Sequence, residues 1–149
     1  MNDLRPILLV EDNLRDVEMT LAALKENHLA NEVIVARHGG EALDYLYRRA
    51  QYANRPAGHP LAIFLDLKMP KVDGLETLRQ IKNDETLKVI PVVMLTSSRE
   101  EIDLVKSYRL GVNAYVVKPV GFQQFIDALR QTGRFWVAIN EPPPAGPLP

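Results

Sequence analysis

Five residues with chemically useful side chains each follow a short apolar run in this sequence. They are two adjacent acids, a third acid, a hydroxyl and an amine: Glu11, Asp12, Asp66, Thr96 and Lys118. Carboxylates that lie close together raise one another's pKa, and a hard divalent cation such as Mg²⁺ relieves that repulsion. Phosphoryl transfer needs a positioned nucleophile and neutralisation of phosphoryl charge, which a carboxylate, a cation and a lysine supply together. The pattern therefore predicts a site that forms an aspartyl phosphate.

Each of these residues taken alone has an ordinary structural explanation. An aspartate after a strand is more often a helix cap than a nucleophile, a threonine there usually satisfies a turn, and a lysine is usually solvated. What favours a site is that all of them occur, in order, at the ends of the first, third, fourth and fifth apolar runs.

The apolar runs themselves are continuous and rich in β-branched residues, which is typical of parallel strands covered on both faces. They are Ile7–Val10, Val33–Ala36, Leu61–Leu65, Val92–Leu95 and Tyr115–Val117. Between them, apolar spacings of three and four predict helices around residues 14–24, 42–46, 75–81, 102–108 and 122–129. Asn13 and Asp73 are placed to cap helix starts, and Gly111 to end the fourth helix. The core face of the first helix is predicted to carry Leu14, Val17, Leu21 and Leu24.

This alternation predicts an α/β fold of the (βα)₅, flavodoxin-like kind: a doubly wound, five-stranded parallel sheet of order 2-1-3-4-5. Ligands of such sheets bind outside the carboxyl ends of the strands, near the switch point between strands 1 and 3. Those are the ends that carry the five residues named above, so the predicted fold gathers them at one edge.

Two segments do not fit this compact unit. Gln51–Pro60 is polar and contains proline and glycine, which predicts a loop inserted before the third strand. Glu141–Pro149 is rich in proline and is expected to be extended or disordered. We therefore expect one domain over residues 1–136 and a disordered tail over residues 137–149.

Composition narrows the class of protein. The chain has 149 residues, a net charge of −1 and no cysteine. Disulfides, thiolate metal sites and thiol nucleophiles are excluded, and the balanced charge gives no support to nucleic-acid or membrane binding. We expect a cytoplasmic protein, since the first residues do not resemble a secretion signal and no apolar stretch approaches the roughly 20 residues of a membrane span.

Four motifs resemble the receiver domain of bacterial two-component response regulators. They are LLVEDN, FLDLKMPKVDG, VVMLTSS and NAYVVKP, and the likeness covers roughly residues 5–132. The resemblance implies that Asp66 is the phosphoacceptor and that Lys118 binds the phosphoryl group, next to a cis bond to Pro119. It implies that Thr96 and Tyr115 are the switch residues.

The same resemblance implies a Mg²⁺ site. Asp12 is the expected direct ligand, Glu11 acts through water, Asp66 shares the ion, and the backbone carbonyl of Lys68 completes the set. Many receiver domains have aspartate where Glu11 stands, so the longer side chain is expected to alter the metal geometry slightly.

A single-domain response regulator is the resulting prediction, with a sensor histidine kinase as partner and no enzymatic activity beyond its own phosphorylation and dephosphorylation. About 17 residues follow the last helix, too few for a DNA-binding effector, so output is expected from the receiver surface. The insertion and the tail resemble regulators that serve bacterial phytochrome kinases. We also expect a homodimer that buries Phe135 and Trp136 between the two chains. In the alternative arrangement, the two side chains fold back onto their own domain.

Two other functions are weighed against this one. An aspartyl-nucleophile, Mg²⁺-dependent phosphatase of the haloacid-dehalogenase type places a second aspartate two residues after the nucleophile, where this chain has Lys68. A non-phosphorylated adaptor on the same fold is expected to have lost Asp66 or Lys118, and both are present.

Overall fold

The five apolar runs form one parallel sheet in the computed structural model, which describes residues 4–26, 29–67, 69 and 73–144. Its strands are β1 (Ile7–Val10), β2 (Val33–Ala36), β3 (Ile63–Leu65), β4 (Val92–Thr96) and β5 (Ala114–Val117). The order is β2-β1-β3-β4-β5, as the sequence predicts. β3 begins two residues later than expected, although Leu61 and Ala62 are still buried.

Register places the carboxyl ends of the strands side by side. Val10 pairs with Ala36 on one side and with Leu65 on the other. Further along the sheet, Leu65 pairs with Met94 and Thr96 pairs with Val117. The residues that follow β1 and β3 therefore emerge next to each other at one edge.

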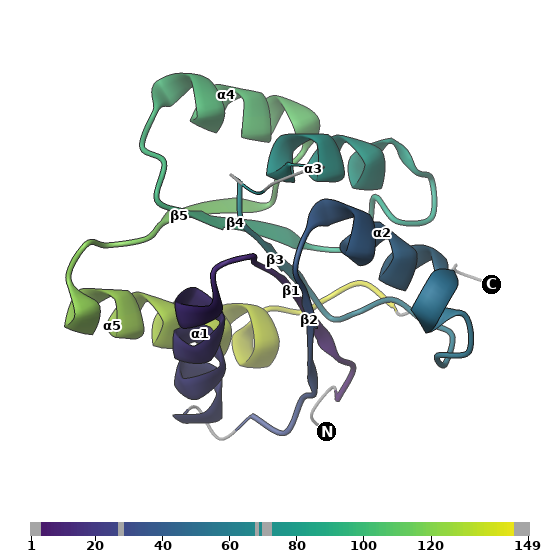
Figure 1. The fold of residues 1–149 in the computed structure, drawn as a ribbon, viewed down its shortest axis with the longest axis horizontal. Helices are drawn as coiled ribbons and strands as arrows, with labels where there is room; N and C mark the ends of the chain where they lie inside the picture. The colour runs from purple at the N-terminus through teal and green to yellow at the C-terminus, as the bar shows by residue number, and fades with distance from the viewer. Residues whose placement is uncertain (1–3, 27–28, 68, 70–72, 145–149) are drawn as a thin grey trace.

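Helices cover both faces of the sheet (Figure 1). α1 (Leu14–Glu26) and α5 (Phe122–Gly133) pack together on one face. α2 (Gly39–Tyr47), α3 (Gly74–Asn83) and α4 (Glu101–Leu110) form the layer on the other. Each face encloses apolar side chains. Leu8, Val10 and Met94 pack with α2 and α3, and Ile7, Leu9 and Val93 pack with α1 and with the segment that follows α5.

The predicted helix caps are confirmed. Asn13 Oδ1 accepts a hydrogen bond from the Asp16 amide at 3.1 Å, and Asp73 Oδ1 accepts one from the Glu76 amide at 2.9 Å. Gly111 ends α4 with φ 101°, a left-handed conformation that favours glycine. A fourth cap was not predicted: His38 Nδ1 accepts from the Glu41 amide at the start of α2.

The predicted core face of α1 is partly wrong. Leu14 and Leu21 are 60% and 37% exposed, whereas Val17, Thr20, Ala23 and Leu24 are buried. Because α1 packs against both the sheet and α5, its buried stripe turns toward α5 and includes small residues. Thr20 fits there because its hydroxyl donates to the Asp16 carbonyl at 2.7 Å.

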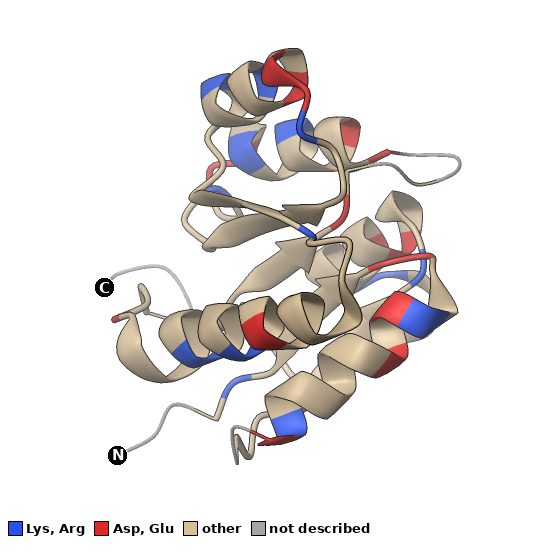
Figure 2. Cartoon of the chain, turned by 90° about the vertical axis from the view of Figure 1, so that its left-hand side faces the viewer, with Lys and Arg blue, Asp and Glu red and all other residues tan. Residues whose placement is uncertain are grey.

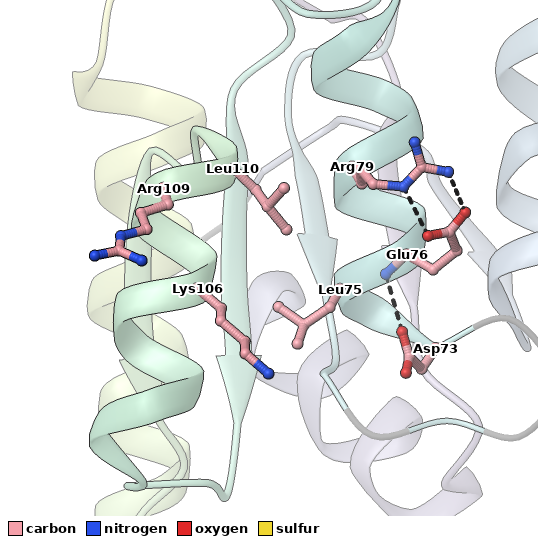
Figure 3. Close-up of a pocket in the computed structure, with 7 residues that line it drawn as sticks. All are labelled: Asp73, Leu75, Glu76, Arg79, Lys106, Arg109 and Leu110. Carbon is pink, nitrogen blue, oxygen red and sulfur yellow. Dashed lines mark hydrogen bonds and ion pairs between the residues drawn. The ribbon is translucent and has the colours of Figure 1, made fainter.

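α4 turns its apolar residues outward. Ile102, Val105 and Tyr108, whose spacing predicts the helix, are all exposed, and its buried residue is Ser107. The Ser107 hydroxyl has no hydrogen-bond partner within the part of the chain that the structure describes. α4 instead packs against α3, where Leu75 and Leu110 face each other across a groove of about 420 Å³ (Figure 3).

The chain after α5 stays helical. A π-helical segment, η2 (Arg134–Ile139), continues α5 and runs three residues past the expected domain boundary. Val137 is buried and Trp136 is half-buried against the sheet, while Phe135 is 45% exposed. Phe135 and Trp136 contact each other edge to face at 5.1 Å between ring centroids. The pair is therefore divided, with the indole on the domain and the phenyl ring toward solvent.

Candidate functional site

Backbone hydrogen bonds continue past the ends of the strands and hold three of the predicted site residues in place. The Glu11 amide donates to the Ala36 carbonyl at 2.9 Å, and the Asp66 amide donates to the Val10 carbonyl at 3.0 Å. At the other side of the sheet, the Lys118 amide donates to the Thr96 carbonyl at 2.7 Å. The backbone positions of Glu11, Asp66 and Lys118 are thus set by the sheet.

Three carboxylates meet at this edge. Oxygens of Glu11, Asp12 and Asp66 all lie within 4.8 Å of one another. Glu11 is 3% exposed and Asp66 is 8% exposed, so neither negative charge is well solvated. Carboxylate oxygens at this spacing are ligands that a hard divalent cation prefers, and the cluster fits such an ion.

Lys118 supplies the positive charge of the site. Its Nζ lies 3.2 Å from Glu11 Oε2, 2.8 Å from Asp16 Oδ2 and 4.0 Å from Asp66 Oδ1. Burial alone lowers the pKa of Lys118, but the hydrogen bond to Asp16 and the charges of Asp66 and Glu11 outweigh it and raise that pKa. The amine is therefore held as an ammonium beside the acids.

Burial has the opposite consequence for the carboxyl groups. It raises the pKa of Glu11 to about 8, against the attraction of Lys118. It also raises the pKa of Asp66, again with Lys118 acting to lower it. A single ammonium does not offset the burial of these acids, and an added cation would favour their ionised forms.

Asp16 is a member of the site that the sequence pattern did not reveal. It lies in the first turn of α1, and Asn13 caps that turn by accepting its amide hydrogen. Nothing in the residue pattern indicates this role, because Asp12 precedes the helix and the approach of Asp16 to Lys118 depends on how α1 lies over the sheet. The predicted carbonyl ligand from Lys68 lies outside the described residues.

The predicted switch residues, Thr96 and Tyr115, both contact Ser98. Thr96 is 1% exposed, and its Oγ1 accepts a hydrogen bond from the Ser98 amide at 3.3 Å. The Tyr115 hydroxyl donates to the Ser98 carbonyl at 3.0 Å. Ser98 Oγ in turn donates to Asp103 Oδ2 in the first turn of α4, at 2.6 Å. These contacts connect the site edge to α4.

The expected cis bond between Lys118 and Pro119 is not found. Among the described residues no peptide bond is cis, so this one is trans. Trans is the form that an X–Pro bond favours by about 0.5–1 kcal/mol.

A groove opens beside Lys118. It has a volume of about 310 Å³ and lies between α1 and the start of α5. Its walls are both polar and apolar, and they include Asp16, Met19, Lys118, Val120 and Phe122. Val120 and Phe122 are exposed, which leaves an apolar rim on the approach to the site.

Charge on the remaining surface is mixed. Figure 2 shows acidic and basic positions interleaved along the helices, in line with the net charge of −1. In the described part of the chain, no helix has the length and apolarity that crossing a membrane requires.

Comparisons with known proteins agree with this geometry. The model of the response regulator receiver domain family matches residues 7–130. The response regulator Rcp1 of Synechocystis is 38% identical over 136 residues, which cover 91% of each chain. The solved structure of the phosphorylated cyanobacterial phytochrome response regulator RcpA has a TM-score of 0.89 at 40% identity, covering 95% of this chain and 99% of that one. The bacteriophytochrome response regulator AtBRR is 63% identical, with a TM-score of 0.74 over 93% of this chain and 99% of that one.

A doubly wound sheet with three acids, a threonine and a lysine at its carboxyl edge defines a phosphorylation-dependent signalling domain and not a conventional enzyme. The chain belongs to the response regulator receiver domain family. Within that family it is similar to regulators associated with phytochromes.

Proposed function

We propose that Asp66 accepts a phosphoryl group from the phosphohistidine of a sensor histidine kinase. The observation that carries this proposal is the meeting of Glu11, Asp12 and Asp66 oxygens within 4.8 Å, with the Lys118 ammonium 4.0 Å from Asp66 Oδ1. An Asp66 oxygen attacks phosphorus, the O–P bond forms, and the N–P bond breaks with its electron pair left on the imidazole. Lys118 neutralises charge on the transferred oxygens, and the buried Thr96 hydroxyl donates to one of them.

The cation proposed for the acid cluster is Mg²⁺. It would be held by Asp12 and Asp66 directly, by Glu11 through water and by the Lys68 carbonyl, and it would neutralise phosphoryl charge. The relatives support a divalent ion here, since a structure of Rcp1 carries Mn²⁺. Asp16 competes with the phosphoryl group for Lys118, because Nζ now lies 2.8 Å from its carboxylate.

Signalling is proposed to pass through Thr96 and Tyr115 to the surface around α4, β5 and α5. When the Thr96 hydroxyl turns toward the phosphoryl group, it leaves the Ser98 amide and frees space that an inward Tyr115 fills. Each hydrogen bond involved contributes about 0.5–1.5 kcal/mol, so phosphorylation shifts a population between two arrangements.

The proposed kinase is of the phytochrome type, which the names of RcpA and AtBRR support for this chain. The groove between α1 and α5 is where the donor histidine would approach, because it opens onto Lys118 and has an apolar rim. A homodimer is proposed as well, with Phe135 as its exposed aromatic contact.

Two other functions are less well supported. A phosphatase of the dehalogenase type needs an aspartate two residues after the nucleophile, and this chain has Lys68 there. An inert adaptor does not need Lys118 buried against the acids, an arrangement that costs desolvation of several charges.

Incubation with acetyl phosphate and MgCl₂, followed by intact mass measurement, tests the phosphorylation directly. We expect one phosphoryl group per chain, stable in acid and labile in base, and none in Asp66→Asn. The matched control is Asp44→Asn, which alters an acid on α2 that pairs with Arg49. Equal labelling of Asp66→Asn and the native chain would show that the phosphoacceptor is elsewhere.

A further inference from the structure

The segment inserted before β3 is fixed to the domain by Arg55. The Arg55 guanidinium donates to the Tyr45 carbonyl at 2.7 Å and lies over the Tyr45 ring at 4.2 Å from its centroid. It also donates to the carbonyls of Pro56 and Gly58, at 2.8 and 3.1 Å. The Arg55 side chain thus joins the last turn of α2 to the second half of the insertion, so this segment is an ordered part of the fold.

From this anchored segment a tyrosine reaches toward the site. Tyr52 closes the 3₁₀ turn η1 (Ala50–Tyr52) and packs edge to face on Tyr45, 5.2 Å between centroids. Its hydroxyl donates to Glu41 Oε1 at 2.8 Å, and the Gln51 amide donates to the same oxygen at 3.3 Å. Glu41, in the first turn of α2, is therefore held from one side by the insertion.

The other oxygen of Glu41 leads to the acid cluster. Glu41 Oε2 accepts a hydrogen bond from the Arg37 amide at 3.0 Å, directly after β2. The Arg37 guanidinium crosses to the neighbouring strand end and donates to the backbone carbonyl of Asp12 at 2.8 Å. A continuous chain of hydrogen bonds thus runs from Tyr52 through Glu41 and Arg37 to Asp12.

We infer that Arg37 is a positioning residue for the cation site, and that the inserted segment supports it through Tyr52 and Glu41. This inference rests on the proposed function, because it takes Asp12 as a cation ligand. Asp12 stands just past the end of β1, where the sheet no longer fixes its backbone, and the Arg37 hydrogen bond takes over that role. Arg37 does not touch the phosphoryl group in this scheme; it acts through Asp12.

The two consequences of losing Arg37 oppose each other. Removing its positive charge favours a cation by simple Coulomb attraction, while freeing the Asp12 backbone disfavours one. High salt distinguishes the two effects, because at about 0.5 M KCl the screening length is about 4 Å and the exposed charge of Arg37 is largely screened. The effect on the Asp12 backbone then remains. Tyr52→Phe separates them in a second way, because it breaks the chain without changing any charge.

The test is isothermal titration calorimetry with MgCl₂ alone, at high salt, on the native chain, Arg37→Gln, Tyr52→Phe and Arg49→Gln. Arg49 is the matched control because it pairs with Asp44 at 2.7 Å, on the same helix as Glu41. We expect the Mg²⁺ dissociation constant to rise about three- to tenfold in Arg37→Gln and about twofold in Tyr52→Phe, and to stay unchanged in Arg49→Gln. At saturating MgCl₂, acetyl phosphate should still label Arg37→Gln with one phosphoryl group per chain.

Contrary outcomes are distinct. Equal Mg²⁺ affinity in Arg37→Gln and Arg49→Gln overturns the positioning role while leaving the proposed function intact. Loss of labelling in Arg37→Gln at saturating MgCl₂ overturns it too, since a residue acting through Asp12 affects affinity alone. If the native chain binds no Mg²⁺, the proposed function fails first. Should Arg37→Gln not fold, Tyr52→Phe decides, and an unchanged affinity there rejects the inference.

Discussion

The hydroxyl of Tyr115 donates a hydrogen bond to the backbone carbonyl of Ser98 at 3.0 Å. The Ser98 amide at the same time donates a hydrogen bond to Thr96 Oγ1, so the two predicted switch residues bind the carbonyl and the amide of the same residue. A change in the hydrogen bond of Thr96 therefore acts directly on Ser98, which is also the partner of Tyr115. The hydrogen bond from Ser98 Oγ to Asp103 connects the same residue to α4.

Thr96→Ala is expected to uncouple phosphorylation from partner binding. The alanine has no hydroxyl that could turn from Ser98 toward the phosphoryl group. Tyr115 therefore keeps its present hydrogen bond to the Ser98 carbonyl. The measurement is kinase affinity with and without beryllofluoride, which imitates the phosphoryl group. Ser97→Ala is the control, because Ser97 is the exposed neighbour. The same beryllofluoride effect in Thr96→Ala and the native chain would count against the switch.

Lys118→Met is expected to slow phosphorylation by acetyl phosphate about a hundredfold, the usual cost of removing one group that stabilises developing charge. The variant also leaves the buried carboxylates of Glu11 and Asp66 without their nearest cation. The rate is measured by mass spectrometry over time. Lys106→Met, which changes an exposed lysine on α4, should label at the native rate. A Lys118→Met rate within a fewfold of native would remove the lysine from the mechanism.

Asp84 gives a prediction for acid stability. Its Oδ1 accepts hydrogen bonds from the Thr86 amide, the Thr86 hydroxyl and the Leu87 amide, and its pKa is lowered to about 2, chiefly by the Thr86 hydroxyl. A carboxyl group whose pKa is lower in the folded chain adds stability above its ordinary value of 3.8 and loses it as pH falls toward 2.

We therefore expect Asp84→Asn to lower the free energy of unfolding by about 1–2 kcal/mol at pH 7. Urea denaturation at several pH values measures this difference, which should shrink as pH falls from about 4 to 2. Glu85→Gln is the neighbouring control, because its carboxylate is exposed and pairs with Lys88 alone among the interactions described. A difference between Asp84→Asn and the native chain that does not depend on pH would contradict the assignment.

Phe135→Ala is expected to weaken the proposed homodimer about tenfold, since a half-exposed phenyl ring gains burial only against a second chain. Trp136→Ala should instead lower monomer stability by about 1–3 kcal/mol, because the indole already packs on the sheet. Light scattering over a concentration series measures the first effect and thermal unfolding the second. Phe122→Ala, at the other end of α5, is the control; a native chain that is monomeric at tens of micromolar ends the dimer proposal.

The five strands could be predicted because parallel strands covered on both faces leave continuous apolar runs, and all five were found within two residues of their ends. Their order was expected because it is the common doubly wound order that suits five strands. The buried faces of helices were harder. Spacing alone predicted that Leu14 and Leu21 lie on the buried face of α1. Because α1 also packs against α5, its buried face instead includes Thr20 and Ala23. In α4 the spacing found the helix, but its apolar residues lie on the solvent side.

The candidate site was predictable to the extent that its residues stand at strand ends. Asp16 was missed because it comes from a helix, and its relation to Lys118 depends on how α1 is placed over the sheet. Arg37 was missed for a different reason. Its contact is with a backbone carbonyl, which leaves no pattern of side-chain types in the sequence.

Gly74 stands at the first residue of α3, where a Cβ would lie 2.2 Å from the carbonyl oxygen of Asp66, and its amide donates to the Leu67 carbonyl at 2.7 Å. The helix is thus seated directly on the backbone of the proposed phosphoacceptor. For protein engineering, this means that β3 and α3 form one module. A chimera that joins β3 of one receiver to α3 of another has to take the glycine and the backbone it contacts at Asp66 and Leu67 from the same protein. Otherwise the acceptor carboxylate is displaced.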